Sequence, residues 1–268
     1  MAWMMGHSFD LSYASSNALT GSSFIRNFIV PFPFINVLSV SGMIEMTGQL
    51  RIMAINGSPR KNGSTAKLLE AFLKGASEMG AETEMVNLYE LEFTGCRECY
   101  LCKIKNGKRY GECAYRDGLT DVIAKVRDCD GFAFGAPIFL GDFAAQGKSF
   151  LERLFFPYTS YEGGDFSLNK QPKPTALFAA MNVKEDFLNE FYRGQLGNTE
   201  AWFKRIMLKD PYTLYSTDTY QFSDYSRYDA GLWNEPEKRA WRDEHFPIDL
   251  QKAEEIGKKV CEDAFKKE

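Results

Sequence analysis

The chain has 268 residues, of which 44% are hydrophobic and 25% charged, a composition typical of a globular protein rather than of a disordered or collagen-like one. Its formal net charge of −4 gives no global positive field that would recruit nucleic acid or acidic lipid, so we expect neither as a partner. With two histidines, His7 and His245, the chain has too few for a multi-histidine metal centre.

Residues 1–48 differ in composition from the rest of the chain. Ser, Phe and Met are frequent there, charges are rare, and no helical or strand period is sustained. The most apolar stretch, 28–40, is interrupted by Pro31 and Pro33 and is too short to span a bilayer. It is a poor signal peptide because the apolar run is broken, lies late in the chain and is followed by no clear small-x-small cleavage site. We therefore expect a poorly ordered extension and no membrane association; an upstream start codon is the other interpretation.

From Leu50 onwards, apolar runs of strand length alternate with segments of helical period. Strands are predicted at 51–55, 84–88, 131–137, 175–181 and 212–216. Helices are predicted at 66–79, 119–126 and 143–154, with one or two more within 182–210 and a closing helix at 250–264 behind Pro247. This alternation predicts one α/β domain over 49–268, a doubly wound five-stranded parallel sheet with helices on both faces, a cysteine-rich loop at 95–113 and an insertion at 182–210.

The loop between the first predicted strand and helix has the composition of a phosphate site. It reads Gly57-Ser58-Pro59-Arg60-Lys61-Asn62-Gly63-Ser64-Thr65, so glycines allow a sharp turn before a helix whose first N–H groups are unpaired. It is neither a Walker A loop nor the G-x-G-x-x-G dinucleotide fingerprint. We predict that it holds a terminal phosphate monoester through Ser58, Asn62, Ser64 and Thr65, with Arg60 adding charge; the alternative is a polar loop that binds nothing.

The loop after the third predicted strand would complete this site. In doubly wound sheets a ligand binds where the strand order reverses, between the ends of the first and third strands. Here the third strand leads into Pro137-Ile138-Phe139-Leu140-Gly141. Pro137 fixes the chain, the N–H groups beyond it can reach ring heteroatoms, and Phe139 can lie beside a planar ring. Alone, this segment is equally consistent with an apolar turn at the sheet edge.

Four of the six cysteines form a cluster with the spacing C-x2-C-x2-C-x10-C: Cys96, Cys99, Cys102 and Cys113. The first three match the compact half of a ferredoxin motif. Three interpretations remain open: ligands of a 4Fe-4S cluster, a structural zinc site, or thiols without a metal. Reduced thiols of this kind favour a cytoplasmic protein over a secreted disulfide scaffold. Cys129 and Cys261 are predicted to be small buried apolar residues.

Together, these motifs resemble the NADPH-dependent FMN reductase family, and within it the iron–sulfur flavoprotein branch. The resemblance covers residues 50 to 155 and rests on three motifs: Gly57-Ser58-Pro59-Arg60 with Gly63-Ser64-Thr65, Gly95-Cys96-x-x-Cys99-x-x-Cys102 followed by Cys113 and Asp117, and Gly135-Ala136-Pro137-Ile138-Phe139. Ten residues separate Cys102 from Cys113, which is more than we expect for the iron–sulfur flavoprotein branch. The sequence therefore departs from the branch pattern at Cys113, the fourth candidate ligand.

The resemblance implies a flavodoxin-like fold with strand order 2-1-3-4-5 and FMN bound at the two loops. Carried over residue by residue, the phosphate contacts fall on Ser58, Arg60, Asn62, Ser64 and Thr65, around Gly63. The ring contacts fall on Pro137, Ile138, Phe139, Leu140 and Gly141, and Asn182 would form a third wall. The family further implies a homodimer or homotetramer with flavins near the interface.

The predicted function is an FMN-dependent oxidoreductase that takes hydride from NAD(P)H and passes electrons to an acceptor. Since this chemistry belongs to the cofactor, no catalytic side chain is assigned. With a cluster present, the protein would instead carry electrons from a ferredoxin-like donor; the partner is thus a small molecule or a ferredoxin-like protein. The alternative from another class is a non-catalytic, zinc-stabilised flavodoxin-like binding module.

Five further features have ordinary structural interpretations. Asp117 is predicted to cap the helix at 119–126. Lys148 and Arg153 are predicted to be solvated surface charges. His245 is predicted to lie on the surface, and the aromatic segment 212–233 to cover sheet and core rather than to line a substrate wall.

Overall fold

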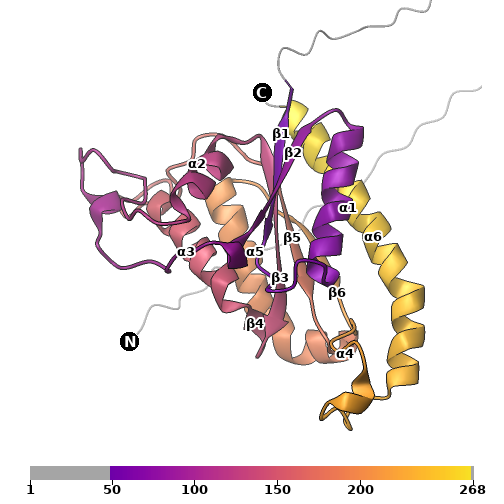
Figure 1. Cartoon of the computed structure of the whole chain (residues 1–268). Helices are drawn as coiled ribbons and strands as arrows, with labels where there is room; N and C mark the ends of the chain where they lie inside the picture. The colour runs from indigo at the N-terminus through magenta and orange to yellow at the C-terminus, as the bar shows by residue number, and fades with distance from the viewer. Residues whose placement is uncertain (1–48, 267–268) are drawn as a thin grey trace, which may run out of the picture. The chain divides into compact units, whose positions relative to one another are not determined.

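The computed structural model describes residues 49–266, and these contain a sheet of five parallel strands in the order β2-β1-β3-β5-β6 (Figure 1). A short sixth strand, β4, pairs antiparallel with the end of β3. The predicted flavodoxin-like fold class is therefore confirmed, with its reversal of strand order between β1 and β3. The strands are β1 (Arg51–Asn56), β2 (Glu82–Asn87), β3 (Gly131–Phe139), β4 (Asp142–Phe143), β5 (Thr175–Ala180) and β6 (Tyr212–Ser216). The predicted extension at 1–48 lies outside the described residues.

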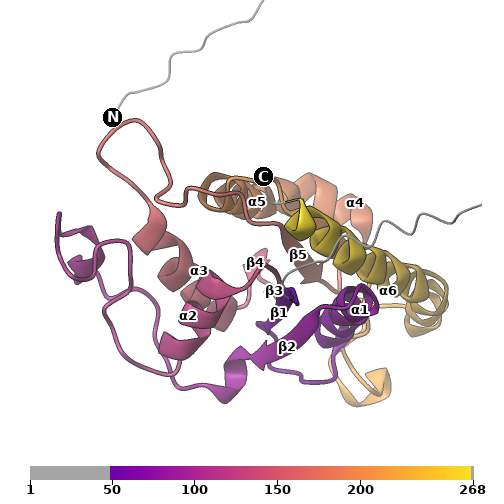
Figure 2. The ribbon, with the colours of Figure 1, turned by 90° about the horizontal axis from the view of Figure 1, so that it is seen from above.

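The interior strands are apolar because helices cover both of their faces. β5 is buried along its whole length and β3 over its first six residues, whereas the edge strand β2 is partly exposed and carries charges at Glu82 and Glu84. Helices α1 and α6 pack on one face of the sheet, and α2, α3 and α5 pack on the other (Figure 2). The helices are α1 (Ser64–Glu78), α2 (Thr120–Asp128), α3 (Ala145–Tyr158), α4 (Glu185–Phe187), α5 (Arg193–Met207) and α6 (Glu235–Phe265).

The final helix, α6, is longer than the sequence predicts. Pro247 suggested a helix start, but α6 begins twelve residues earlier at Glu235 and runs through Pro247. Its start is set by Asn234, whose side chain accepts a hydrogen bond from the Glu237 N–H. The prediction failed because proline inside a helix removes one hydrogen bond, a loss that the packing of a long helix outweighs.

Helices α1 and α6 pack in direct backbone contact. A Cβ atom added to Gly257 would lie 2.0 Å from the carbonyl oxygen of Phe72, and one added to Gly75 would lie 2.0 Å from the carbonyl oxygen of Glu254. The two helices run in the same direction, because four residues beyond the contact of Gly257 with Phe72, Cys261 Sγ lies 3.8 Å from the carbonyl oxygen of Ala76. Glycine is therefore required at both crossing positions.

The connections complete the fold. Short 3₁₀ turns lie at Leu88–Glu90, Leu101–Lys103 and Tyr225–Arg227, and a π-helical turn at Leu188–Tyr192 joins α4 to α5 within the predicted insertion. The predicted cap Asp117 does not occupy the N-cap of α2, which is Leu119; its carboxylate instead accepts a hydrogen bond from the Leu119 N–H. Among the helices of residues 49–266, none is long and apolar enough to cross a bilayer.

Candidate functional site

A cavity of about 980 Å³ lies at the carboxyl ends of β1, β3 and β5, beside the N-terminus of α1. This is the crevice in which doubly wound sheets bind ligands. Eleven of the twelve residues predicted to bind FMN line this one cavity. They are Ser58, Arg60, Asn62, Gly63, Ser64, Thr65, Pro137, Ile138, Phe139, Leu140 and Asn182. Within the described part of the chain, Gly141 is the exception; it has φ +85° and lies behind the turn, against Tyr192.

The first loop is shaped by its own hydrogen bonds. The Gly57 N–H donates to the Gly135 carbonyl at 2.7 Å, and a Cβ at Gly57 would lie 3.0 Å from the Ala136 side chain, so this turn leaves little room. Asn56 Oδ1 accepts from the Ser58 N–H at 3.0 Å, and Ser58 Oγ accepts from the Arg60 N–H at 3.1 Å. These bonds bring the loop from β1 to the first turn of α1.

The first turn of α1 is open to an anion. Within α1 as described, the N-cap Gly63 provides no side-chain hydrogen bond and the first turn contains no acidic residue. The first N–H groups of the helix and the hydroxyls of Ser64 and Thr65 are therefore available at the positive end of the helix dipole. This is the arrangement that a phosphate group requires.

The charge of the cavity matches an anionic ligand. Three cations line it, Arg60, Lys67 and Arg242, whereas no Asp or Glu of the described residues does so. Arg60 donates from Nη1 to the Gln221 carbonyl at 2.6 Å, which holds its guanidinium across the cavity from the first loop. A phosphate therefore enters surroundings with no like charge to repel it.

Asn182 presents an unsatisfied acceptor beside this cavity. Its Nδ2 donates to Gln221 Oε1 at 2.7 Å, but its buried Oδ1 has no hydrogen-bond partner within the described residues. A buried acceptor without a partner is costly, so a donor on a bound ligand would stabilise it. FMN offers such donors in its ring N–H and ribityl hydroxyl groups, and the residues present thus fit this cofactor.

The turn after β3 exposes apolar side chains on the cavity wall. Phe139 is half exposed and Leu140 fully exposed, and Leu140 adopts the left-handed conformation with φ +53°. A strained, exposed apolar turn at a cavity is an arrangement that a flat ligand would cover. This position is the one predicted for the flavin ring.

The third wall includes residues that the sequence analysis missed. Residues 219–223, after β6, line the cavity and are attached to the loop after β5 by the Thr219 N–H, which donates to the Met181 carbonyl at 2.9 Å. The aromatic segment was predicted to cover sheet and core, but Tyr220 and Phe222 line the cavity. Their place after a parallel strand was the available signal, because all carboxyl ends meet at this edge.

Beneath this wall, Lys238 of α6 forms a buried ion pair with Asp218, and each residue is at most 3% exposed. Its ammonium also donates to the Asn182 carbonyl at 2.9 Å. The unexpected N-terminal half of α6 therefore supports the loop that carries Asn182.

The four clustered cysteines line a second, much smaller cavity of about 20 Å³. Burial raises the pKa of the Cys102 thiol, and the neighbouring thiols of Cys113 and Cys96 raise it further against the opposing effect of Lys103. In residues 49–266, however, no three His, Cys, Asp or Glu side chains are placed so that they hold a metal ion. The donor set thus suits iron–sulfur or zinc chemistry, while the arrangement described has no preformed metal site.

Arg153 holds the cysteine loop against α3. It is 2% exposed, so the prediction of a solvated charge was wrong. Its Nε donates to Cys113 Sγ at 2.9 Å, and its two terminal nitrogens donate to both Asp117 oxygens and to the carbonyls of Thr94 and Tyr115. All five N–H groups of the guanidinium are therefore used. Residue spacing on a helix did not show that a loop folds over this position.

Two further contacts fix the loop to the same helix. The Cys96 N–H donates to Glu152 Oε2 at 3.1 Å, and the ammonium of Lys103 donates to the carbonyls of Phe156, Pro157 and Thr159 at the end of α3. A cation is favourable there because the last carbonyls of a helix are unpaired. The cysteine loop is thus attached at both of its ends to one rigid element.

Comparison with known proteins gives a family match and two kinds of relatives. The model of the family described as NADPH-dependent FMN reductase matches residues 50–183. An iron–sulfur flavoprotein of Methanocaldococcus jannaschii is 32% identical over 104 residues, which are 39% of this chain and 51% of that protein. One of Methanosarcina thermophila is 32% identical over 104 residues, 39% of this chain and 52% of that protein. The chain spans about half the length of the curated relatives it matches.

Solved structures share the fold at low sequence identity. An NAD(P)H:quinone oxidoreductase from Methanothermobacter marburgensis has a TM-score of 0.56 and 17% identity, covering 80% of this chain and 98% of that one. An FMN-dependent NADH-azoreductase from Bacillus anthracis, solved with FMN, has a TM-score of 0.53 and 13% identity, covering 78% and 99%. At this identity the likeness supports the flavodoxin-like fold alone.

Proposed function

The chain belongs to the NADPH-dependent FMN reductase family, and from this premise we propose that it binds FMN, takes hydride from NAD(P)H and passes the electrons to an acceptor. The observation that carries the proposal is the convergence of both predicted loops and Asn182 on one cavity that has cations and no carboxylate among its described lining residues. We further propose that the protein is cytoplasmic and forms a homodimer or homotetramer.

Different lining residues would contact different parts of the cofactor. The first turn of α1, with Ser64 and Thr65, would bind the phosphate, and Arg60 would add charge. Asn182 would accept a hydrogen bond through its unpaired Oδ1. Phe139 and Leu140 would exclude water from one side of the ring. When bound, FMN supplies the redox chemistry itself, and the chain supplies position and electrostatics.

Because the redox chemistry would belong to the cofactor, we assign no catalytic side chain to the cavity. Hydride transfer requires that donor and acceptor be placed in contact, which an open cavity with an apolar wall allows. The openness also suits a second small molecule that binds after the first has left.

The test is anaerobic reduction of the FMN-loaded full chain by NADPH and, separately, by NADH. We expect at least one of them to bleach the flavin absorbance within seconds, and a quinone or a nitro compound to restore it. Dithionite serves as the control, because it reduces any bound flavin without using a nicotinamide site. If dithionite bleaches the flavin and neither nicotinamide does so, the reductase proposal is wrong.

The second candidate is an iron–sulfur flavoprotein that carries electrons from a ferredoxin-like donor. It is favoured by the four cysteines that line one cavity and by the buried guanidinium on Cys113 Sγ, since a cation beside sulfur stabilises thiolate ligands. Iron, acid-labile sulfide and zinc in anaerobically prepared protein decide the matter. Iron together with sulfide would support the electron carrier, and zinc would support a structural zinc site. If none of the three is found, the cysteines are thiols without a metal.

A further inference from the structure

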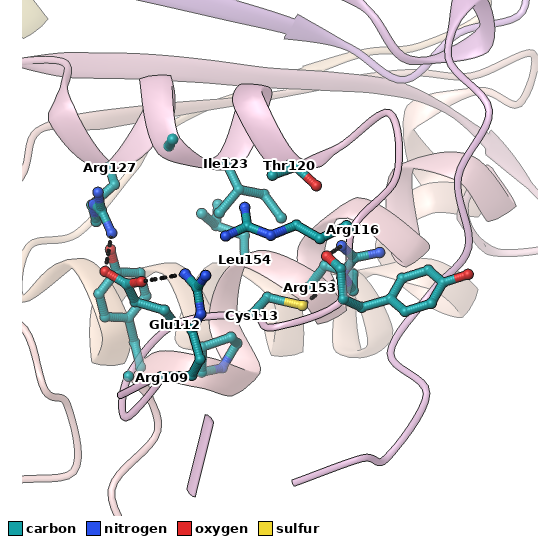
Figure 3. A pocket seen from close by; sticks show the side chains of 14 residues that line it. Arg109, Glu112, Cys113, Arg116, Thr120, Ile123, Arg127, Arg153 and Leu154 are labelled. Atoms are coloured by element: carbon teal, nitrogen blue, oxygen red, sulfur yellow. Dashed lines mark hydrogen bonds and ion pairs between the residues drawn. The ribbon is translucent and has the colours of Figure 1, made fainter. Parts of the chain in front are cut away.

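A third cavity, of about 210 Å³, lies between the 109–116 segment, α2 and α3 (Figure 3). Among the described residues it shares no lining residue with the flavin cavity, so its occupant would be a different molecule. The long spacing between Cys102 and Cys113 creates this cavity, because Arg109, Gly111 and Glu112 lie within that spacing and form one of its walls.

The lining carries an excess of positive charge. Four arginines and one carboxylate, that of Glu112, line the cavity in the part of the chain that the structure describes. Glu112 is shared: one oxygen accepts from Arg127 Nη1 at 2.5 Å and the other from Arg109 Nη1 at 3.4 Å. Arg153 has all of its N–H groups engaged elsewhere. Within the described residues, Arg127 donates from Nε to Asp128 and from Nη1 to Glu112, so it keeps its Nη2 group for a ligand. Most of the free donors of the cavity therefore belong to Arg109 and Arg116.

Arg116 is the exceptional residue of this group. Across residues 49–266 its guanidinium makes no hydrogen bond or ion pair, although it belongs to a cavity wall. Figure 3 shows the guanidinium groups of Arg116 and Arg109 directed into the same space, below α2. The two planar guanidinium groups face the same space, and that of Arg116 has no partner within the described residues. Paired N–H donors of this kind match the geometry of a carboxylate or phosphate group.

The floor of the cavity is apolar. Ile123 of α2 and Leu154 of α3 lie beside the arginines, and Pro157 also lines the cavity. The volume lies below the range of about 300–1,000 Å³ that is usual for drug-sized ligands. The occupant is therefore small, with one charged end and one apolar end.

We propose that this cavity binds a small organic anion, whose carboxylate or phosphate monoester group lies between Arg109 and Arg116 and whose short apolar body rests on Ile123 and Leu154. The site is independent of the proposed flavin chemistry, and the Arg116→Gln variant should leave flavin reduction unchanged.

The test is isothermal titration of the full chain at constant ionic strength with benzoate, phenyl phosphate and benzamide. Benzoate and phenyl phosphate carry the two candidate anionic groups, and the tighter of them assigns the group. Benzamide is the neutral counterpart of benzoate. We expect at least one anion to bind saturably and at least about tenfold more tightly than benzamide, since hydrogen bonds to charged groups contribute this much.

Arg116→Gln and, separately, Arg109→Gln should each weaken that binding by about tenfold or more. Lys108→Gln is the matched control, because Lys108 is an exposed cation of the same loop that is not part of the cavity wall, and it should leave the affinity unchanged. Thermal unfolding of each variant checks that the fold is kept. The proposal is overturned if neither anion binds saturably, if benzamide binds equally well, or if Lys108→Gln weakens binding as much as Arg116→Gln.

Discussion

Replacing Arg153 by methionine is expected to lower the free energy of unfolding by about 3–5 kcal/mol, the usual effect of removing one partner of a buried ion pair. The reason is that Asp117, the carbonyls of Thr94 and Tyr115, and Cys113 Sγ all lose a donor, and the Asp117 side chain, only 11% exposed, keeps a charge without its partner. Urea unfolding of the full chain measures the effect. A change below about 0.5 kcal/mol, the size of an ordinary surface substitution, would contradict this account.

Lys148→Met provides the matched control on the same helix. The Lys148 side chain is 43% exposed and forms a surface ion pair with Asp142 at 3.1 Å, so its loss should change stability by no more than about 1 kcal/mol. Affinity for FMN is the second control. The flavin turn precedes the start of α3 and Arg153 lies eight residues further along, about 12 Å by helical rise, so flavin binding should persist in the folded variant.

The same ion pair gives stability a specific dependence on pH. Burial alone would raise the pKa of Asp117, but hydrogen bonds from Arg153 and from the N–H groups of Leu119 and Thr94 hold it below its ordinary value. The unfolded carboxyl therefore binds a proton at a higher pH than the folded one, and stability declines as the pH falls from the ordinary aspartate pKa through the lowered one. The Arg153→Met variant should show a weaker decline over that acidic range.

Gly257→Ala is expected to destabilise the protein by about 2–3 kcal/mol, although alanine is the better helix former by about 1 kcal/mol. The added Cβ would lie 2.0 Å from the Phe72 carbonyl oxygen, so α1 and α6 must separate. Gly197→Ala in α5 is the matched control. No heavy atom within the described chain lies within 4 Å of that Cβ, and the change should stabilise by about 0.5–1 kcal/mol.

Urea unfolding of both glycine variants tests the close contact of α1 and α6 directly. Equal stabilisation by the two substitutions would mean that the helices are not in backbone contact. Because α6 also carries Lys238 beneath the Asn182 loop, separation of the helices should in addition weaken FMN binding in Gly257→Ala.

The parts of the candidate site that the sequence predicted share one property: each is a short local pattern at the end of a buried strand. A continuous apolar run that ends at Gly57 or Pro137 has few alternative structures besides a buried strand and a turn. Parallel strands then bring the loops at their carboxyl ends to the same edge of the sheet. Asn182, which follows β5, was instead carried over from the family resemblance. Local pattern and global topology agree at all three positions, and the cavity contains all three segments.

The parts that the sequence did not predict depend on tertiary contacts. Arg153 has the spacing of an exposed helical residue, and its burial arises only because the cysteine loop folds over α3. The wall at 219–223 was missed because its aromatic residues were taken to cover sheet and core. Its support Lys238 was missed because Pro247 was taken as the start of α6. In both places a polar residue is buried with all of its partners distant in sequence, which local periodicity does not encode.

The central claim is that the N-terminal turn of α1 binds the phosphate of FMN. Equilibrium titration of the full chain with FMN and with riboflavin, which lacks only that phosphate, tests it most directly. We expect FMN to bind about 100-fold more tightly, as two charge-assisted hydrogen bonds would provide. The preference should collapse in the Ser64→Ala, Thr65→Ala double variant and persist in Ser77→Ala at the exposed far end of the same helix. Equal affinities of the unaltered protein for FMN and riboflavin would contradict the claim.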